Sequence, residues 1–228
     1  MTAEPRPRMT TILLFRHALT ALTGSVLAGW MPGVHLDERG LAQAAALGER
    51  LRSVPLVAVV TSPLERCRET AAALLAGREP PPPLHLDERV GEVRYGTWTG
   101  RDLKTLRREP LWAIVQGHPS AAVFPDGEGL AGMSARATAA VRAWNAELGP
   151  DATYALVSHG DVVKAILADA LGLHLDGFQR IAVDPCSLSV VRYGRLGSHV
   201  ERVNDRAGDV AGLVPPRRRP ARRPARAQ

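Results

Sequence analysis

Two histidines and two arginines stand where the chain is expected to leave a β-sheet. Arg16 and His17 follow one apolar run, Arg66 comes shortly after a second run, and His159 follows a third. Ligands of open α/β sheets bind beyond the carboxyl ends of the strands, so these four side chains are expected to meet at one edge. Planar guanidinium groups donate paired hydrogen bonds to phosphate, and a neutral imidazole is a competent nucleophile. The combination predicts chemistry on a phosphoryl group.

Transfer of a phosphoryl group through a histidine also needs a proton donor for the leaving oxygen, which then acts as the base for water. Glu92 is the candidate, because it lies in a glycine-rich stretch, 90–100, that follows a short predicted strand. The alternative for Glu92 is an ordinary solvated loop carboxylate, and Glu88 is a second carboxylate nearby. A second histidine, preferably cationic, would stabilise charge on the equatorial oxygens, and His159 is suited to that role.

The elements that must position these residues follow from hydrophobic periodicity and turn chemistry. Apolar runs with β-forming residues predict strands at 10–15, 56–60, 84–86, 153–157, 180–183 and 188–192. Amphipathic spacing predicts helices at 37–51, 62–76, 103–108, 111–116, 130–148 and 161–171. Ser62, Pro63 and Glu65 resemble a helix start with a capping box. Strands that alternate with helices predict an α/β fold, with a three-layer, mostly parallel central sheet and helices on both faces.

Composition limits the class of partner. The chain has 228 residues, 45% of them hydrophobic, and a formal net charge of +6. Residues 215–228 hold six arginines and no acid, so the other 214 residues carry 23 basic and 23 acidic side chains. A nucleic-acid partner is therefore not expected for the folded part, and the role of the basic end stays open. We expect a flexible leader at 1–8, one catalytic domain at 9–205, and a disordered Pro/Arg-rich tail at 206–228.

Cysteines and apolar runs predict a reduced, cytoplasmic setting without a membrane segment. Cys67 and Cys186 have no partner at metal-ligand or disulfide-framework spacing. The longest apolar runs are about seven residues, far short of a membrane span. His159 and Asp161 are potential metal ligands, but no third ligand stands at a recognisable spacing, so neither a metal nor a cofactor is expected.

Four segments in order carry a family resemblance: FRHALT, TSPLERCRETA, GEVRYGTWTG and VSHGD. They resemble the motifs of the histidine phosphatase superfamily, of the phosphoglycerate-mutase-like or branch-one type, from about residue 10 to 193. The longer segments GVHLDERG, EPLWAIVQGHPSAAVFPDGE and FQRIAVDPCSLSVVRY are similar to an actinobacterial-type subgroup of phosphomutases and broad phosphatases. The resemblance implies a phosphoglycerate-mutase-like fold and a small-molecule phosphate ester as the partner.

The resemblance also implies a role for each candidate residue. His17 would be the phosphorylated nucleophile, and Glu92 the proton donor. Arg16, Arg66 and His159 would complete the phosphate pocket. The implied function is metal-independent hydrolysis of a small phosphorylated metabolite through a phosphohistidine, with no cofactor.

Three positions depart from the family pattern. Ala18 stands where the motif has glycine, and costs about 1 kcal/mol if that residue needs a positive φ. Thr23 stands where the family often has a phosphate-contacting asparagine. Val93 replaces the arginine by which mutases bind the substrate carboxylate, and the span from Glu92 to His159 is short for a mutase insertion. These two features favour hydrolysis over a phosphoglycerate-type mutase, and a catalytically impaired phosphate-binding homologue is the other alternative.

Overall fold

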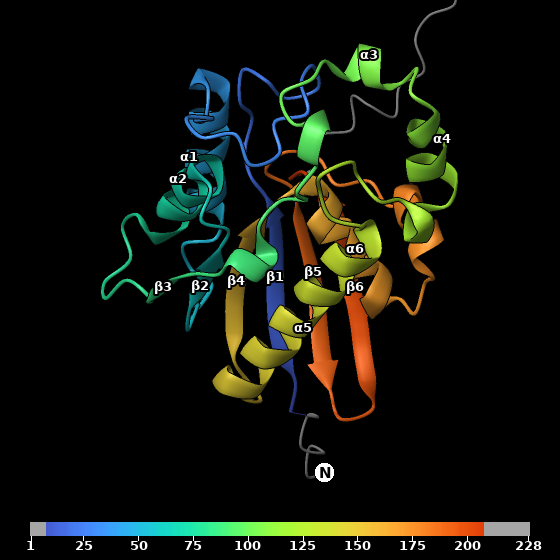
Figure 1. Cartoon of the computed structure of the whole chain (residues 1–228). Helices are drawn as coiled ribbons and strands as arrows, with labels where there is room; N and C mark the ends of the chain where they lie inside the picture. The colour runs from blue at the N-terminus through green and yellow to red at the C-terminus, as the bar shows by residue number, and fades with distance from the viewer. Residues whose placement is uncertain (1–7, 208–228) are drawn as a thin grey trace, which may run out of the picture.

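The apolar runs form one six-stranded sheet with helices on both of its faces (Figure 1). The computed structural model describes residues 8–207. The strands are β1 (Thr10–Arg16), β2 (Val59–Thr61), β3 (Leu84–Leu86), β4 (Thr153–Ser158), β5 (Leu188–Gly194) and β6 (Gly197–Asp205). Their order in the sheet is β3-β2-β4-β1-β5-β6. The pairs among β3, β2, β4 and β1 are parallel, whereas β5 and β6 pair antiparallel at the other edge. The predicted α/β architecture with a mostly parallel sheet is confirmed.

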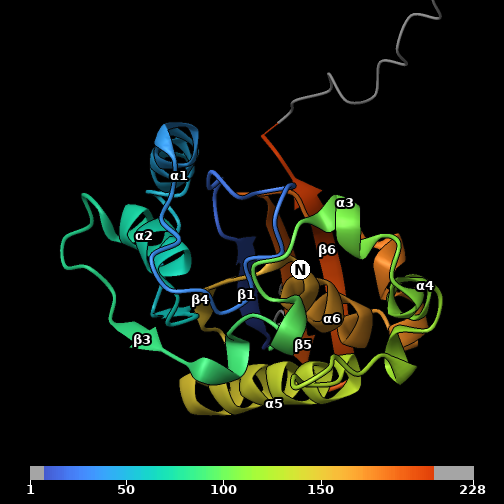
Figure 2. The same ribbon diagram turned by 45° about the horizontal axis from the view of Figure 1, so that its top comes forward.

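The side chains of each central strand alternate between two helical layers, as the period of two requires. In β1, Leu13 and Phe15 belong to the cluster beneath α1 (Glu38–Arg50) and α2 (Glu65–Leu75). Ile12 and Leu14 belong to the larger cluster beneath α5 (Leu130–Leu148) and α6 (Gly160–Ala170). Figure 2 shows α1 and α2 on one side of the sheet and α5 on the other.

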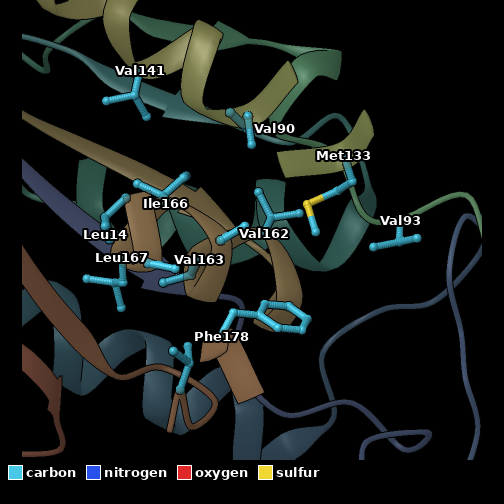
Figure 3. Packing of buried hydrophobic residues seen from close by; sticks show 14 of the residues in the cluster. Leu14, Val90, Val93, Met133, Val141, Val162, Val163, Ile166, Leu167 and Phe178 are labelled. Carbon is cyan, nitrogen blue, oxygen red and sulfur yellow. The ribbon is translucent and has the colours of Figure 1, made fainter. Parts of the chain in front are cut away.

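The larger cluster extends beyond the helices to the loop that carries Glu92. Figure 3 shows Val90 and Val93 with Met133 and Val162, and all four side chains are buried. Val93 is fully buried in this cluster. Its side chain therefore contributes to the core, and the loop is held to the sheet by apolar contacts on both sides of Glu92.

A helical segment covers the end of the sheet toward which β1 runs (Figure 1). It contains α3 (Leu103–Leu106) and α4 (Pro110–Gly117). Asp102 caps α3 by accepting a hydrogen bond from the Thr105 amide, and Pro110 begins α4. We call residues 95–124 the lid.

Two local predictions are wrong. Residues 180–183 are not a strand: a 3-10 helix covers Leu175–Arg180, and the Val183 carbonyl accepts a hydrogen bond from Arg16 instead of a neighbouring strand. Ile181 and Val183 are buried in the core, which explains the strand-like apolar pattern. Ser62 does not cap a helix, because α2 begins at Glu65 after Leu64. The hydroxyl of Ser62 is used in the site described below.

The predicted leader at 1–8 and tail at 206–228 fall outside the described residues, except for residues 8, 206 and 207. Within the described part of the chain, none of the helices combines the length and the apolar character needed to cross a membrane.

Candidate active site

The carboxyl ends of three parallel strands bring the predicted residues together. Arg16 pairs with Ser158 in the register of β1 and β4, and Thr61 of β2 pairs with Val157 of β4. His17 and His159 are the first residues after β1 and β4, and their ring centroids lie 5.3 Å apart. Sequence position after each strand was therefore sufficient to place the two histidines side by side.

The His17 ring is held in one tautomer. Its Nδ1 lies 2.8 Å from the Ala18 carbonyl, so it donates, and Nε2 accepts from Arg66 Nε at 3.3 Å. Burial, with the positive charges of Arg66 and Arg16, lowers the pKa of His17 to about 3. The imidazole is therefore neutral at physiological pH, and its Nε2 lone pair faces the guanidinium groups.

Ala18 fits its position without backbone strain. It is not among the described non-glycine residues with positive φ, and its side chain packs fully buried against Leu36 and Ala44. Its amide donates to Thr70 Oγ1 at 3.1 Å. The conditional cost of replacing the motif glycine therefore does not arise.

Both arginines have unsatisfied donors in the site. Arg66 is 2% exposed, and its Nη2 donates to the Gly29 carbonyl and to His159 Nδ1. Arg16 Nη1 donates to the Val183 carbonyl. Arg66 Nη1 and Arg16 Nε are buried and have no hydrogen-bond partner in the described part of the chain. Unpaired buried donors are costly, so these two atoms mark a place for an anion with several acceptor oxygens. Arg66 is therefore not on a solvent-exposed helix face, where it could pair with Glu65 or Glu69.

His159 lies between Arg66 and Ser62. Its Nδ1 accepts from Arg66 at 3.2 Å, so its Nε2 donates to Ser62 Oγ at 2.8 Å. Burial and the charge of Arg66 lower the pKa of His159 well below its usual value. His159 is therefore neutral at physiological pH, in contrast to the cationic form that the sequence analysis preferred. The Cys67 thiol lies 3.4 Å from His159 Nε2, but burial raises its pKa to about 12, which leaves it protonated.

Glu92 faces the same space from the far side. One of its oxygens accepts from the Val93 amide at 3.0 Å, and the other lies 3.6 Å from His159 Nδ1. Burial, with the negative charge of Asp161, raises the pKa of Glu92 to about 7. A carboxyl group with this pKa is protonated in a substantial fraction of molecules at neutral pH. Glu88, by contrast, is exposed and pairs with Arg94.

Arg136 of α5 anchors the loop that carries Glu92. Its guanidinium donates to the carbonyls of Arg89, Gly91 and Glu92, at 2.8 to 2.9 Å, and pairs with both oxygens of Glu128. The indole of Trp30 donates to the Glu92 carbonyl as well. The backbone of this loop is thus held by side chains from two distant segments.

We expect Arg136→Ala to lower the free energy of unfolding by about 2–4 kcal/mol, because three carbonyls and a half-buried carboxylate lose a charged partner. Urea denaturation measures the change. Arg142→Ala is the matched control, since Arg142 lies on the same helix in an exposed pair with Asp169 and should cost at most about 1 kcal/mol. Equal effects of the two substitutions would contradict the anchoring role.

Thr23 lies in the wall of the pocket, where its hydroxyl is 3.0 Å from Thr20 Oγ1 and accepts from the Thr20 amide. Its predicted contact with phosphate stays a prediction. Within residues 8–207, no group of three or more His, Cys, Asp or Glu side chains is arranged to hold a metal ion.

These features fit the sequence family that the motifs resemble. Residues 12–206 match the family model of the histidine phosphatase superfamily, branch 1. The chain belongs to this family. The match spans both histidines, Arg66 and Glu92, and extends from β1 to just beyond the end of β6.

Proteins similar to this chain are named for different activities. The chain is 30% identical over 188 residues to the probable phosphoglycerate mutase GpmB of Cronobacter sakazakii, over 81% of this chain and 86% of the relative. It resembles the structure of YhfR of Bacillus stearothermophilus, with a TM-score of 0.79, 28% identity and coverage of 86% and 97%. A mycobacterial glucosyl-3-phosphoglycerate phosphatase has the same fold, with a TM-score of 0.77, 22% identity and coverage of 87% and 100%. The actinobacterial-type subgroup stays a prediction.

Sequence reasoning missed three contributions to the site and its support. Ser62 was interpreted as a helix cap, although its place directly after β2 was a signal for the site. Lys164 lines the pocket one helical turn after Asp161, so helical spacing could have indicated it. Arg136 gave no local signal, because its contacts depend on how α5 packs against a loop 44 residues away.

Proposed function

We propose that this histidine phosphatase hydrolyses small phosphate monoesters without a metal, through a phosphohistidine at His17. The observation that carries the proposal is the pair of unsatisfied guanidinium atoms, Arg66 Nη1 and Arg16 Nε, buried beside a neutral imidazole. Helix α6 begins at Gly160 on the same wall and adds the positive end of its dipole. A phosphate dianion would satisfy these donors.

The proposed reaction has two steps. In the first, His17 Nε2 forms a bond to phosphorus, the bond from phosphorus to the alcohol oxygen breaks, and Glu92 gives its proton to that oxygen. In the second, water attacks phosphorus and gives a proton to Glu92, the bond to Nε2 breaks, and inorganic phosphate leaves. Arg16 and Arg66 stabilise the charge on the equatorial oxygens in both steps, and His159 Nδ1 holds the Arg66 guanidinium in place by accepting its hydrogen bond. The contact of His159 with phosphate stays a prediction.

The test combines hydrolysis of p-nitrophenyl phosphate in EDTA with trapping of radiolabelled phosphate on the protein by a quench in alkaline detergent. We expect undiminished hydrolysis in EDTA and an acid-labile, base-stable label on His17. Loss of activity in EDTA, or turnover with no label on a histidine, would overturn the proposal. Tight vanadate binding without turnover would instead favour a non-catalytic phosphate-binding protein.

A phosphoglycerate-type mutase is the second candidate, because curated relatives are named probable phosphoglycerate mutases. Burial of Val93 in the core argues against it, since no cation for a substrate carboxylate stands at that position. Incubation with 3-phosphoglycerate and 2,3-bisphosphoglycerate distinguishes the reactions: a mutase forms 2-phosphoglycerate, whereas a hydrolase releases inorganic phosphate.

The raised pKa of Glu92 predicts how the rate depends on pH. The donor must be protonated, so kcat/KM for an alkyl phosphate should fall by about tenfold per pH unit once the pH exceeds about 7. Glu92→Gln should lower kcat/KM by about 10²–10⁴-fold and remove this alkaline limb. The effect should be smaller for p-nitrophenyl phosphate, whose leaving group needs less help from an acid. An unchanged limb in Glu92→Gln would assign it to another group.

A further inference from the structure

The pocket continues well beyond the phosphate end. It has a volume of about 290 Å³, and its charged end is formed by Arg16, His17, Arg66 and Glu92. The remaining wall comes from the loop at residues 22–29, from the lid, and from one side of α6 with the 3-10 helix that follows it. The phosphoryl group fills the charged end, so this remaining wall contacts the alcohol part of an ester.

Apolar and aromatic side chains form one large part of that wall, beside the polar side chains of Thr20, Thr23, Gln116 and Gln179. Tyr95 and Phe124 meet edge to face with centroids 4.9 Å apart, and Trp98 and Trp112 lie nearly parallel at 6.4 Å. Further apolar lining comes from Leu22, Val26, Leu27, Leu103 and Val115. Aromatic walls of this kind bind flat apolar groups through buried area and ring contacts.

The single cation of the outer wall, within the described residues, is already paired. Lys164 Nζ donates to Gln179 Oε1 at 3.0 Å and lies 3.6 Å from an Asp161 oxygen. The other Asp161 oxygen accepts from the Tyr95 hydroxyl at 3.0 Å. A second anionic group on a substrate would have to displace Asp161 from Lys164 and would meet its negative charge.

We propose that the alcohol part of the substrate is uncharged and mainly apolar, with an aromatic group packed against Trp112. Esters that carry a second anion are disfavoured. The proposal rests on the proposed phosphatase function and names its substrate class. Trp112 is the wall residue to test, because it is only partly buried and borders the pocket, whereas Trp98 is 3% exposed within the core.

The first experiment compares three esters of primary alcohols in EDTA: 3-phenylpropyl phosphate, glycerol 3-phosphate and 3-phosphoglycerate. All three have alkyl leaving groups, so differences report the body of the alcohol more than its acidity. We expect kcat/KM for 3-phenylpropyl phosphate to exceed that for 3-phosphoglycerate by about tenfold or more. A ratio below threefold, or a reversed order, would overturn the substrate class.

The second experiment measures the ratio of kcat/KM for 3-phenylpropyl phosphate to that for glycerol 3-phosphate in two variants. Trp112→Ala should reduce this ratio by about fivefold or more. Ile114→Ala is the matched control on the same helix, because Ile114 is 39% exposed and is not part of the pocket wall. A wild-type ratio in Trp112→Ala would refute the aromatic contact, and a variant that fails to fold loses both rates rather than the ratio.

These outcomes separate the two proposals. Failure of the phosphatase function would give no hydrolysis of any ester and no labelled His17. Failure of the substrate class alone would leave labelling and hydrolysis intact and change only the order of the three esters.

Discussion

His17→Ala should reduce hydrolysis of p-nitrophenyl phosphate by about 10⁴-fold or more, because among residues 8–207 no other nucleophile is placed to attack a phosphoryl group at the proposed site. The Cys67 thiol is buried with its pKa raised to about 12, and His159 is engaged with Arg66 and Ser62. The variant should also lose the acid-labile label. Its affinity for inorganic phosphate should change less than its rate, since both guanidinium groups remain.

His199→Ala is the control for this variant, since His199 is an exposed histidine on β6. It should retain the wild-type rate and label. If His17→Ala keeps more than about a tenth of the activity, a covalent intermediate on this residue is untenable. Circular dichroism of both variants excludes unfolding as the cause of a loss.

The second large effect is expected at Arg66. Its three donor contacts, to His17 Nε2, His159 Nδ1 and the Gly29 carbonyl, come from one planar group and leave Nη1 for phosphate. Arg66→Lys keeps the charge but not this geometry, and should lower kcat/KM by about 10²-fold or more. Arg66→Met removes both and should lower it by about 10³-fold or more.

Arg66→Met should also change the pKa values of His17 and His159. The charge of Arg66 is the second cause, after burial, of the lowered pKa of His17 and of His159. Its removal should raise both pKa values, which NMR titration of the imidazole protons measures directly. Arg68→Met, two residues further along on the exposed face of α2, should change neither the rate nor these pKa values. Unchanged imidazole titration in Arg66→Met would show that burial and the remaining charges, Arg16 among them, set both pKa values.

Much of the site was predictable because strand ends are visible in the sequence. Arg16 and His17 end one apolar run and His159 follows another, and parallel pairing then brings them together without further information. The same reasoning would have placed Ser62 at this edge, because it follows β2 directly. Its local pattern resembled a capping box instead, and the prediction that it caps a helix was wrong. A serine hydroxyl at that position can either cap a helix or bind a side chain of the site, and the contact with His159 shows that it does the second.

Other parts of the structure depend on contacts that no local pattern reports. The segment 180–183 has the composition of a strand, yet the Val183 carbonyl accepts a hydrogen bond from Arg16. The side chains of Ile181 and Val183 pack in the core. Glu92 could be selected from the sequence only by its place in the glycine-rich stretch after β3, whereas its burial and its raised pKa depend on contacts with distant segments. The role of Arg136 in holding the loop that carries Glu92 depends on the packing of α5 against it, which the local sequence does not indicate.

Three of the four tryptophans of the chain lie around the pocket. Trp98 and Trp112 line it, and Trp30 donates its indole proton to the Glu92 carbonyl, whereas Trp144 is hydrogen-bonded to Asp87 elsewhere in the core. The enzyme therefore carries its own optical reporter. Intrinsic fluorescence should follow the arrival of an ester, the formation of the phosphoenzyme and the departure of the alcohol in real time, without any attached dye.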